Sequence, residues 1–581
     1  MIHSILTRHF LRRFLENDLI APDADRSHLL AVVGASLFST TVFVSMMMSA
    51  FKYLVGFYTP GQAAIASLDD KFFYVSLSMI VVALLAVAQW DALVVDARDA
   101  AIFDPLPVRP LTIRRAKLAA VAIFGASAAA LVNLAPTIIF PLLLLFEHRV
   151  GLAGTALLPL THAAITVVAG AFGFISVIAL REASAAILGP RLFARMSPWL
   201  QGTLIVMLGT ALLVLPPAAT RVEHDQLHSA RVMYLPPAWF LGTYERVAGH
   251  VLIDEPRTRL NSRLKRADVA PTATYRSDAA LFAALSQRAL TAFVTVTLIA
   301  ALAYFVNARR PAGAPRAAAR RRRPRVAPTL ARLAWLRSPA ARAGFQFTLA
   351  ALWRSSTHRL TIAGCGAVAL AISLVALSGI DLPDVVARGR AIPRLLIVQP
   401  FLFGMLLVGF RHAIRVPAEL RANWGFQLAW QGQDRQFLAG ARRAALIALA
   451  GPALTAVFVL DTLVLGPGLA FAHALLGAAG AVVFLEALMV GYDKVPFTCT
   501  YLPSENMKAL GPLYFAMFLI GASNFGRMES IALAGGDPTR LLLTLVATFA
   551  PFRVYAVTHH RLAPVDFDEA PATTQKLGLN A

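Results

Sequence analysis

Apolar runs of about 20 residues recur along this chain, and they constrain its fold more than any other feature. A helix of about that length crosses the roughly 30 Å of hydrocarbon in a bilayer. The sequence has 581 residues, of which 57% are hydrophobic and 15% charged, and its mean hydropathy is +0.64. Because lipid offers no water to backbone N–H and C=O groups, long apolar runs cross it as helices. We therefore predict an all-α, polytopic (multi-pass) membrane protein.

The apolar runs divide into two sets with a similar layout, which predicts about twelve transmembrane helices in two six-helix halves. The halves are residues 1–308 and 341–581. Each has a larger polar insert after its second span and a smaller one after its fourth. The predicted spans lie near Leu29–Ser49, Phe72–Val94, Leu118–Phe146, Ala153–Leu180, Gly202–Leu215, Ala289–Asn307, Leu360–Leu377, Leu395–Phe410, Ala444–Leu465, Leu469–Val490, Leu513–Phe525 and Leu541–Val557.

Three further segments are read from their residue pattern. Met1–Ile20 places Ile2, Phe10 and Phe14 on one helical face, which predicts an amphipathic helix in the membrane interface, and the stripe Phe345–Trp353 predicts a second one. The alternative is an ordinary helix packed on protein. Residues 309–340 are rich in Pro, Ala and Arg and predict a disordered, basic cytoplasmic linker.

Arginine-rich loops set the orientation. The N-terminus, the inserts Asp96–Lys117 and Arg181–Gln201, and the stretch after Asn307 are all rich in arginine, so we expect them in the cytoplasm. The chain is then a multi-pass protein of the plasma (inner) membrane with both termini cytoplasmic. The long segment 216–288 lies outside, and within it Tyr234–Val247 predicts an interfacial helix on the outer leaflet or part of a small folded cap.

The formal net charge of +22 predicts contact with anionic membrane lipids rather than with nucleic acid, since no soluble domain gathers basic and aromatic residues on one face. The phosphate-binding loop G-x-x-x-x-G-K-[ST], the zinc motif H-E-x-x-H and the nucleophile motif G-x-S-x-G are all absent from the sequence. Cys365 and Cys499 form neither a disulfide framework nor a metal-ligand spacing. We expect no enzyme activity, cofactor or metal in this chain.

Polar residues inside the apolar runs are the weak candidates for an intramembrane site. Asp91 and Glu486 stand near predicted cytoplasmic ends of spans, where pairing with an arginine is favoured over substrate or proton handling. Asn133 favours hydrogen bonding between helices, and with Pro136 and Pro141 it predicts a bent or split third span. Asp461 is explained by solvation, and His162 and His473 by burial in a core.

The insert Asp96–Lys117 is a helical stretch (Asp96–Phe103) that Pro105, Pro107 and Pro110 then interrupt. Held between two spans, it offers a surface on which a soluble partner docks. The alternative is a plain cytoplasmic loop.

Four short motifs resemble one family: LPVRPLTI (Leu106–Ile113), YLPPAWFLGTYE (Tyr234–Glu245), VPAELRANW (Val416–Trp424) and KVPFTCTYLP (Lys494–Pro503). With the span layout, they resemble the permease subunit of a bacterial type 2 ABC exporter, in the large form with two fused halves. The resemblance implies a separate ATP-binding cassette ATPase subunit as partner, with ATP-Mg bound there, and export of an unidentified, possibly amphipathic substrate. The ATPase-coupling residues that it implies are Asp96, Asp99, Phe103, Asp104 and Pro105, then Glu419, Arg421 and Trp424.

Two departures stand against the resemblance. The second-half insert Arg411–Arg443 is longer than a usual coupling segment and carries Trp424 and Trp430, and the outer segment of the first half has no counterpart in the second. An ion-coupled secondary transporter or an intramembrane enzyme is the alternative function. An ion-coupled transporter would need acidic or histidine side chains at mid-membrane, and the sequence shows few.

Overall fold

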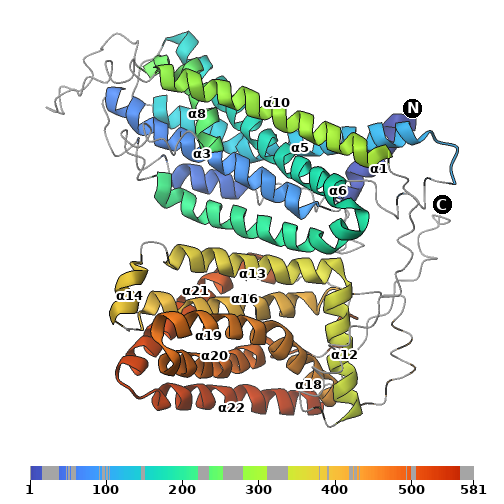
Figure 1. Ribbon diagram of the computed structural model, residues 1–581, viewed down its shortest axis with the longest axis vertical. Helices are drawn as coiled ribbons and strands as arrows, with labels where there is room; N and C mark the ends of the chain where they lie inside the picture. Colours follow the sequence, from blue (N-terminus) through green and yellow to red (C-terminus); the bar gives the residue numbers. More distant parts are fainter. Residues whose placement is uncertain are drawn as a thin grey trace. The chain divides into compact units, whose positions relative to one another are not determined.

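A computed structural model of the chain describes residues 2–15, 38–47, 49, 53, 60–90, 92–93, 99, 103, 105–145, 151–219, 234–252, 279–309, 336, 338–377, 380–388, 391–417, 423, 425, 428, 430, 432, 434–492, 494–498 and 505–562. The chain forms two compact units, which consist mainly of Asp23–Ala317 and Ala318–Ala581. Both are built from helices (Figure 1).

Unit 1 consists of helices that pack around the long helix α6. Its elements are α1 (Ile2–Leu15), α3 (Pro60–Ala88), α5 (Pro110–Leu145), α6 (Leu152–Ala219), α8 (Pro236–Ala248), the 3₁₀ helix η3 (Gly249–Leu252) and α10 (Ala279–Arg309). Helices α3, α5 and α10 each pack against α6. Residues 38–47 are helical as well.

Unit 2 follows with α12 (Pro339–Arg354), α13 (Ser356–Leu377), α14 (Leu382–Arg388), α15 (Pro393–Leu396), α16 (Val398–Ala413), α18 (Asp434–Ala445), the π-helix η5 (Leu446–Ala450), α19 (Gly451–Leu465), α20 (Pro467–Leu488), α21 (Glu505–Ala534) and α22 (Thr539–Leu562). Gly466, with φ 83°, makes the turn from α19 to α20, and Pro467 opens the new helix. In Figure 1, α12 runs across the direction of α13 rather than along it.

Eight helical segments among the described residues are long and apolar enough to cross a membrane. They are Ser67–Ala88, Pro110–Leu145, Leu152–Val214, Ala279–Arg309, His358–Leu377, Pro393–Ala413, Arg435–Leu465 and Pro467–Leu488. A polytopic all-α protein is thus confirmed at the level of helix length and composition. Twelve spans in two six-helix halves stay a prediction.

Helix α5 corrects the expectation of a split third span. It runs unbroken through Pro136 and Pro141. The Asn133 side chain donates at 2.7 Å both to the Ala129 carbonyl and to Ser78 Oγ on α3. Membrane helices tolerate proline when neighbouring helices and side chains hold the surrounding backbone in place, as α3 does here. The predicted role of Asn133 in joining helices is confirmed by its bond to Ser78.

Helix α6 contains the insert Arg181–Gln201, which Gly189, Pro190 and Pro198 predict to be broken, and the break occurs at Gly189 alone. This basic segment is helical on both sides of one residue, Gly189, whose φ of 71° and ψ of 166° break the helix. Residues on both sides of the break pack into the same core around Trp90, while Leu158 and Leu212 share a second core. The chain therefore reverses at Gly189, as the sharp turn of α6 in Figure 1 shows. Glycine permits this because it has no Cβ to clash at positive φ.

The two amphipathic helices pack on protein. In α1, Leu6, Phe10 and Phe14 are buried against α5, whereas Ile2 and Ile5 are exposed. In α12, Phe345 and Leu352 are buried against α18 and Trp353 is exposed. In each helix, most apolar residues of the stripe pack against the neighbouring helix and a few are exposed. Packing on protein therefore accounts for most of the stripe.

Helix α8, predicted as an interfacial helix or as part of a folded cap, packs on protein, and its place relative to the membrane stays a prediction. It packs against α3, α6 and α10 inside the unit. Its aromatic residues Phe240 and Tyr244 are fully buried, and Glu245 is buried beside them. A carboxylate at such a place needs a charged partner, which α3 supplies.

Candidate functional site

The first insert is anchored at one end and open at the other. Phe103 is 6% exposed and packs against Phe10 of α1, with 5.6 Å between ring centroids, and Asp99 is buried nearby in the sequence. The following turn and the start of α5 are open: Leu106 is 47% and Leu111 57% exposed. One exposed leucine thus lies in the proline-rich turn and the other in the first turn of α5.

Basic residues are exposed on the same elements. Arg109 and Arg115 flank the leucines in the sequence, and Arg8 and Arg12 are exposed on α1. Lys117 of α5 is buried, with its ammonium group 4.7 Å from the Phe10 ring centroid and 5.1 Å from that of Phe14. These cation–π contacts tie α1 to the first turns of α5.

Of the predicted coupling residues, Asp99, Phe103 and Pro105 belong to this feature: the first two are buried and Pro105 is exposed. The remaining five lie outside the described residues: Asp96, Asp104, Glu419, Arg421 and Trp424. The same holds for Asp91. Their roles stay predictions.

The second insert is held by backbone contacts to the short loop after α20. Phe497 donates its backbone N–H to the Ile414 carbonyl at 2.8 Å, and Asn423 donates its side-chain amide to the Thr498 carbonyl at 2.8 Å. His358 of α13 lies 2.9 Å from the Val416 carbonyl. The structure thus brings together the VPAELRANW and KVPFTCTYLP segments, which sequence reasoning treated separately.

Glu486 lies within ion-pair distance of two arginines. Its carboxylate is 3.8 Å from Arg442 of α18 and 3.5 Å from Arg553 of α22. The predicted pairing with arginine is confirmed, and it joins three helices of unit 2.

A buried ion pair in unit 1 is the first group that sequence reasoning missed. Lys71 Nζ of α3 lies 2.7 Å from Glu245 Oε1 of α8, with side-chain exposures of 2% and 0%. The ammonium group also lies 5.0 Å from the Tyr244 ring centroid. Helix α8 is not among the candidate spans, and burial there raises the pKa of Glu245, a rise that the Lys71 ammonium opposes. The pair holds α8 inside the unit.

Polar side chains extend from this pair into the unit. Tyr244 Oη lies 3.4 Å from His162 Nδ1 on α6, Tyr74 Oη lies 2.7 Å from Ser49 Oγ, and Tyr53 donates to Asp70. The signal available in the sequence was the run Asp69–Lys71, three consecutive charged residues ahead of an apolar run. The second predicted span begins directly after this run, at Phe72. His162 is buried, as predicted.

A second buried cluster occupies unit 2 and overturns the explanation of Asp461 by solvation. Asp461 of α19 is 3% exposed, and its Oδ2 lies 3.5 Å from His473 Nε2 on α20. The other ring nitrogen, His473 Nδ1, lies 2.6 Å from Glu529 Oε1 on α21. A histidine thus bridges two carboxylates on two other helices. Within the described part of the chain, no group of three His, Cys, Asp or Glu residues has a geometry that would hold a metal ion.

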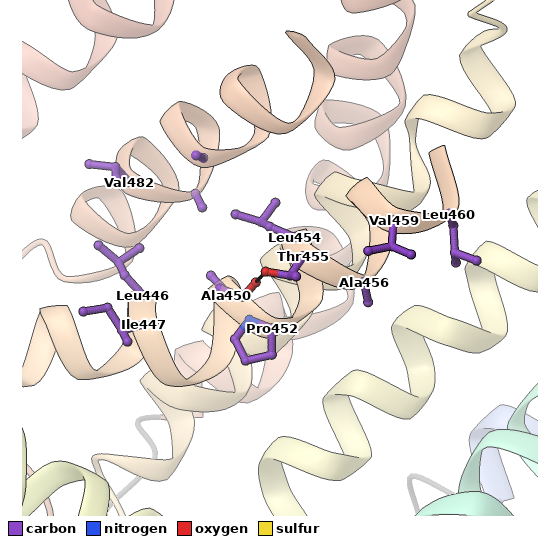
Figure 2. A pocket seen from close by; sticks show the side chains of 13 residues that line it. Leu446, Ile447, Ala450, Pro452, Leu454, Thr455, Ala456, Val459, Leu460 and Val482 are labelled. Carbon is purple, nitrogen blue, oxygen red and sulfur yellow. Dashed lines mark hydrogen bonds between the residues drawn. The ribbon is translucent and has the colours of Figure 1, made fainter. Parts of the chain in front are cut away.

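An apolar hollow of about 990 Å³ lies between η5, α19 and α20 (Figure 2). Pro452 opens α19 beside the π-helix, and the Thr455 hydroxyl donates to the Gly451 carbonyl at 2.9 Å. The thirteen lining residues carry no charge and one hydroxyl: Leu446, Ile447, Ala450, Gly451, Pro452, Leu454, Thr455, Ala456, Val459, Leu460, Ala478, Ala481 and Val482. Such a wall suits a hydrocarbon chain.

Comparison of the chain with protein families, curated proteins and solved structures gives no match.

Proposed function

We propose that this chain is the membrane permease of an ATP-driven exporter and that a separate ATPase subunit binds the first insert. One observation carries the proposal: Phe103 is buried against α1 while Leu106 and Leu111, a few residues on, are exposed. A docking site that transmits motion needs exposed residues that bind the partner and buried residues that connect the site to the transmembrane helices. In this insert, Leu106 and Leu111 are exposed and Phe103 is buried. The resemblance to type 2 ABC exporters supplies the identity of the partner.

The contacts supply a path for the motion. Pro110 opens α5 directly after the exposed turn, so a displacement of the turn passes into α5. From there Lys117 connects to Phe10 and Phe14 of α1, and Asn133 connects to Ser78 of α3. ATP-bound and ATP-free partners would favour different positions of these helices through their different contacts with the turn.

The substrate in this proposal is amphipathic. The hollow in Figure 2 offers an uncharged wall for its apolar part. Transport direction, the two-half arrangement and the inner-membrane location belong to the same proposal and rest on the family resemblance and on the arginine distribution.

The test is to purify the tagged chain from its native host in mild detergent and to measure the ATPase that accompanies it. We expect the double substitution Leu106→Ser and Leu111→Ser to remove the partner and its ATPase activity while leaving the chain folded. Leu152→Ser, at a residue that is 93% exposed at the start of α6, is the matched control and should keep both. If no nucleotide-binding protein accompanies the wild-type chain, or if the double variant retains it, the proposal is wrong.

An ion-coupled secondary transporter is the second candidate, and a specific observation favours it. The sequence shows few charges at mid-span, but the structure buries Lys71, Glu245, Asp461 and Glu529 between helices. Buried ionisable residues in membrane proteins often mark ion pathways. Purified chain in liposomes separates the two candidates: transport driven by a proton gradient without ATP would support this one, and transport dependent on ATP and a second subunit would exclude it.

A further inference from the structure

The Asp461–His473–Glu529 cluster holds one hydrogen fewer than its contacts require. The 2.6 Å contact between Nδ1 and Glu529 Oε1 needs a hydrogen between the two atoms. Nε2 and Asp461 Oδ2 lie 3.5 Å apart, an ion-pair distance at which neither atom makes a hydrogen bond to a described residue, and a second hydrogen between them would make this approach attractive. A neutral imidazole carries a single N–H and two carboxylates carry none. With that single hydrogen, one ring nitrogen presents its lone pair to an anionic oxygen.

One additional proton removes the repulsion between the lone pair and the anionic oxygen, whether it binds to His473 or to either carboxylate. It can convert His473 to imidazolium, which donates to both carboxylates. It can instead reside on either carboxyl group, which then donates to the ring nitrogen that lacks a hydrogen. Each arrangement joins α19, α20 and α21, and lowers the net charge of the cluster from −2 to −1. In a site with little water, that reduction matters more than it would at a surface.

Among the described residues, no ion pair joins another positive charge to the cluster. The exposures of Asp461, His473 and Glu529 are 3%, 1% and 0%. Arg394 of α15, Arg527 of α21 and Arg540 at the start of α22 are exposed, and the described ion pairs join none of them to the cluster. The acidic side chains described on neighbouring elements are Asp381 and Asp537, which are exposed, and Asp384 of α14, which is half-buried. A proton is therefore the simplest cation that reaches the cluster.

A fourth polar group points to the same place. Gln399 of α16 is 1% exposed, and neither atom of its amide has a hydrogen-bond partner among the described residues. It fits against Gly477, one helical turn after His473, where a Cβ would lie 2.1 Å from the amide carbon. A buried amide left open beside a bridged histidine is typical of a polar site inside the bundle rather than of a sealed core.

We propose that Asp461, His473 and Glu529 form a proton-binding site that holds α19 against α20 and α21 and releases them when the proton leaves. Asp461 lies five residues before Gly466, so the site is about 7.5 Å along the helix from that turn. Loss of the proton weakens the contact of α19 with α20 and α21 at that end of unit 2. A fall in pH restores the proton and the contact. The site does not depend on an ATPase partner, and it works in an exporter as in an ion-coupled transporter.

Hydrogen exchange on the purified full chain in detergent tests the proposal, with rates corrected for the intrinsic pH dependence of exchange. Between about pH 5 and about pH 9, wild-type peptides from α19 and α20 should stay protected at low pH, and protection should then fall about tenfold per pH unit, as loss of one proton requires. Asp461→Asn supplies the missing hydrogen permanently through its amide, so its protection should be high and independent of pH. Glu529→Gln should behave in the same way. Asp384→Asn is the control and should keep the wild-type pH dependence.

Two results would overturn the proposal. One is wild-type protection of α19 and α20 that does not change with pH. The other is an Asp461→Asn or Glu529→Gln variant that follows the wild-type pH profile. If both amide variants are unprotected at every pH, the site requires charged carboxylates for packing alone, and the proposal fails as well.

Discussion

The Lys71–Glu245 pair of unit 1 and the Asp461–His473–Glu529 cluster of unit 2 bury charge between helices in different ways. Unit 1 pairs Lys71 with Glu245 at 2.7 Å, so one positive and one negative group cancel. Unit 2 sets two carboxylates on one imidazole, and His473 balances them only in part. A matched pair fixes a structure over a wide pH range, whereas an unmatched cluster depends on the proton concentration. The first arrangement suits an internal brace and the second a sensor.

In both units, an arginine on one helix donates a hydrogen bond to a backbone carbonyl near the end of another helix. In unit 1, Arg181 of α6 donates through Nε to the Trp90 carbonyl just after α3, at 2.9 Å. In unit 2, Arg411 of α16 donates through Nε to the Leu488 carbonyl at the end of α20, at 2.7 Å. In the predicted two-half layout, α16 corresponds to α3 and α20 to the first part of α6. Under that prediction, the arginine lies on the opposite partner of a corresponding helix pair. Either position satisfies a carbonyl at a helix end and places a cation there.

The largest expected effect concerns the matched pair. Lys71→Met leaves the Glu245 carboxylate buried without its cation, and we expect the unfolding free energy of the purified chain to fall by about 3–5 kcal/mol. The double variant Lys71→Met with Glu245→Leu should recover most of that loss, because both charges are then gone. Thermal unfolding in detergent measures all three proteins. Equal losses in the single and double variants would show that packing, not charge, holds α8 in place.

This prediction has a counterpart in unit 2. Asp461→Asn also removes a buried charge, but at alkaline pH it should leave the midpoint of unfolding unchanged or raise it. A destabilisation of Asp461→Asn as large as that of Lys71→Met would show that the two buried groups do not differ in how they depend on charge.

The next effect concerns the close packing of the amphipathic helix α12 on α18 in unit 2. Unit 2 brings α12 and α18 into backbone contact: a Cβ at Gly440 would lie 2.0 Å from the Ala341 carbonyl oxygen, and one at Gly344 would lie 2.1 Å from that of Phe437. Gly440→Ala should therefore cost about 3 kcal/mol of unfolding free energy. Gly364→Ala on α13 meets no atom within 4 Å and should be neutral or stabilise the helix by about 0.5–1 kcal/mol. Chemical unfolding of the two variants measures the difference, and similar values would contradict the close contact.

The smallest effect concerns these two arginines, Arg181 and Arg411. Arg181→Gln and Arg411→Gln should each lower the unfolding free energy by about 1.5 kcal/mol, the contribution of a hydrogen bond from a charged donor. The two losses should be similar if the two hydrogen bonds are equivalent. Arg394→Gln, at an exposed residue of α15, is the control and should change stability by less than about 0.5 kcal/mol. Thermal shift assays of the three variants would show whether one unit depends on its arginine more than the other.

The sequence by itself determined the features that depend on local residue order. Apolar runs long enough to span a bilayer predicted helices that the structure contains, because a chain in lipid satisfies its backbone within each helix. The stripes of α1 and α12 were visible as a helical period. Phe103 was singled out within the first insert, and Asn133 and Glu486 were predicted to bond between helices and to pair with arginine.

Tertiary structure alone decided which charges meet. Lys71 and Glu245 are 174 residues apart, and His473 and Glu529 are 56 apart, so no local pattern links them. It also decided that α8 packs inside unit 1, since that depends on contact with α3, α6 and α10. Asp461 shows the physical reason most clearly. Near the end of an apolar run, solvation is the expected outcome, and only the approach of α20 and α21 removes the water and replaces it with a histidine.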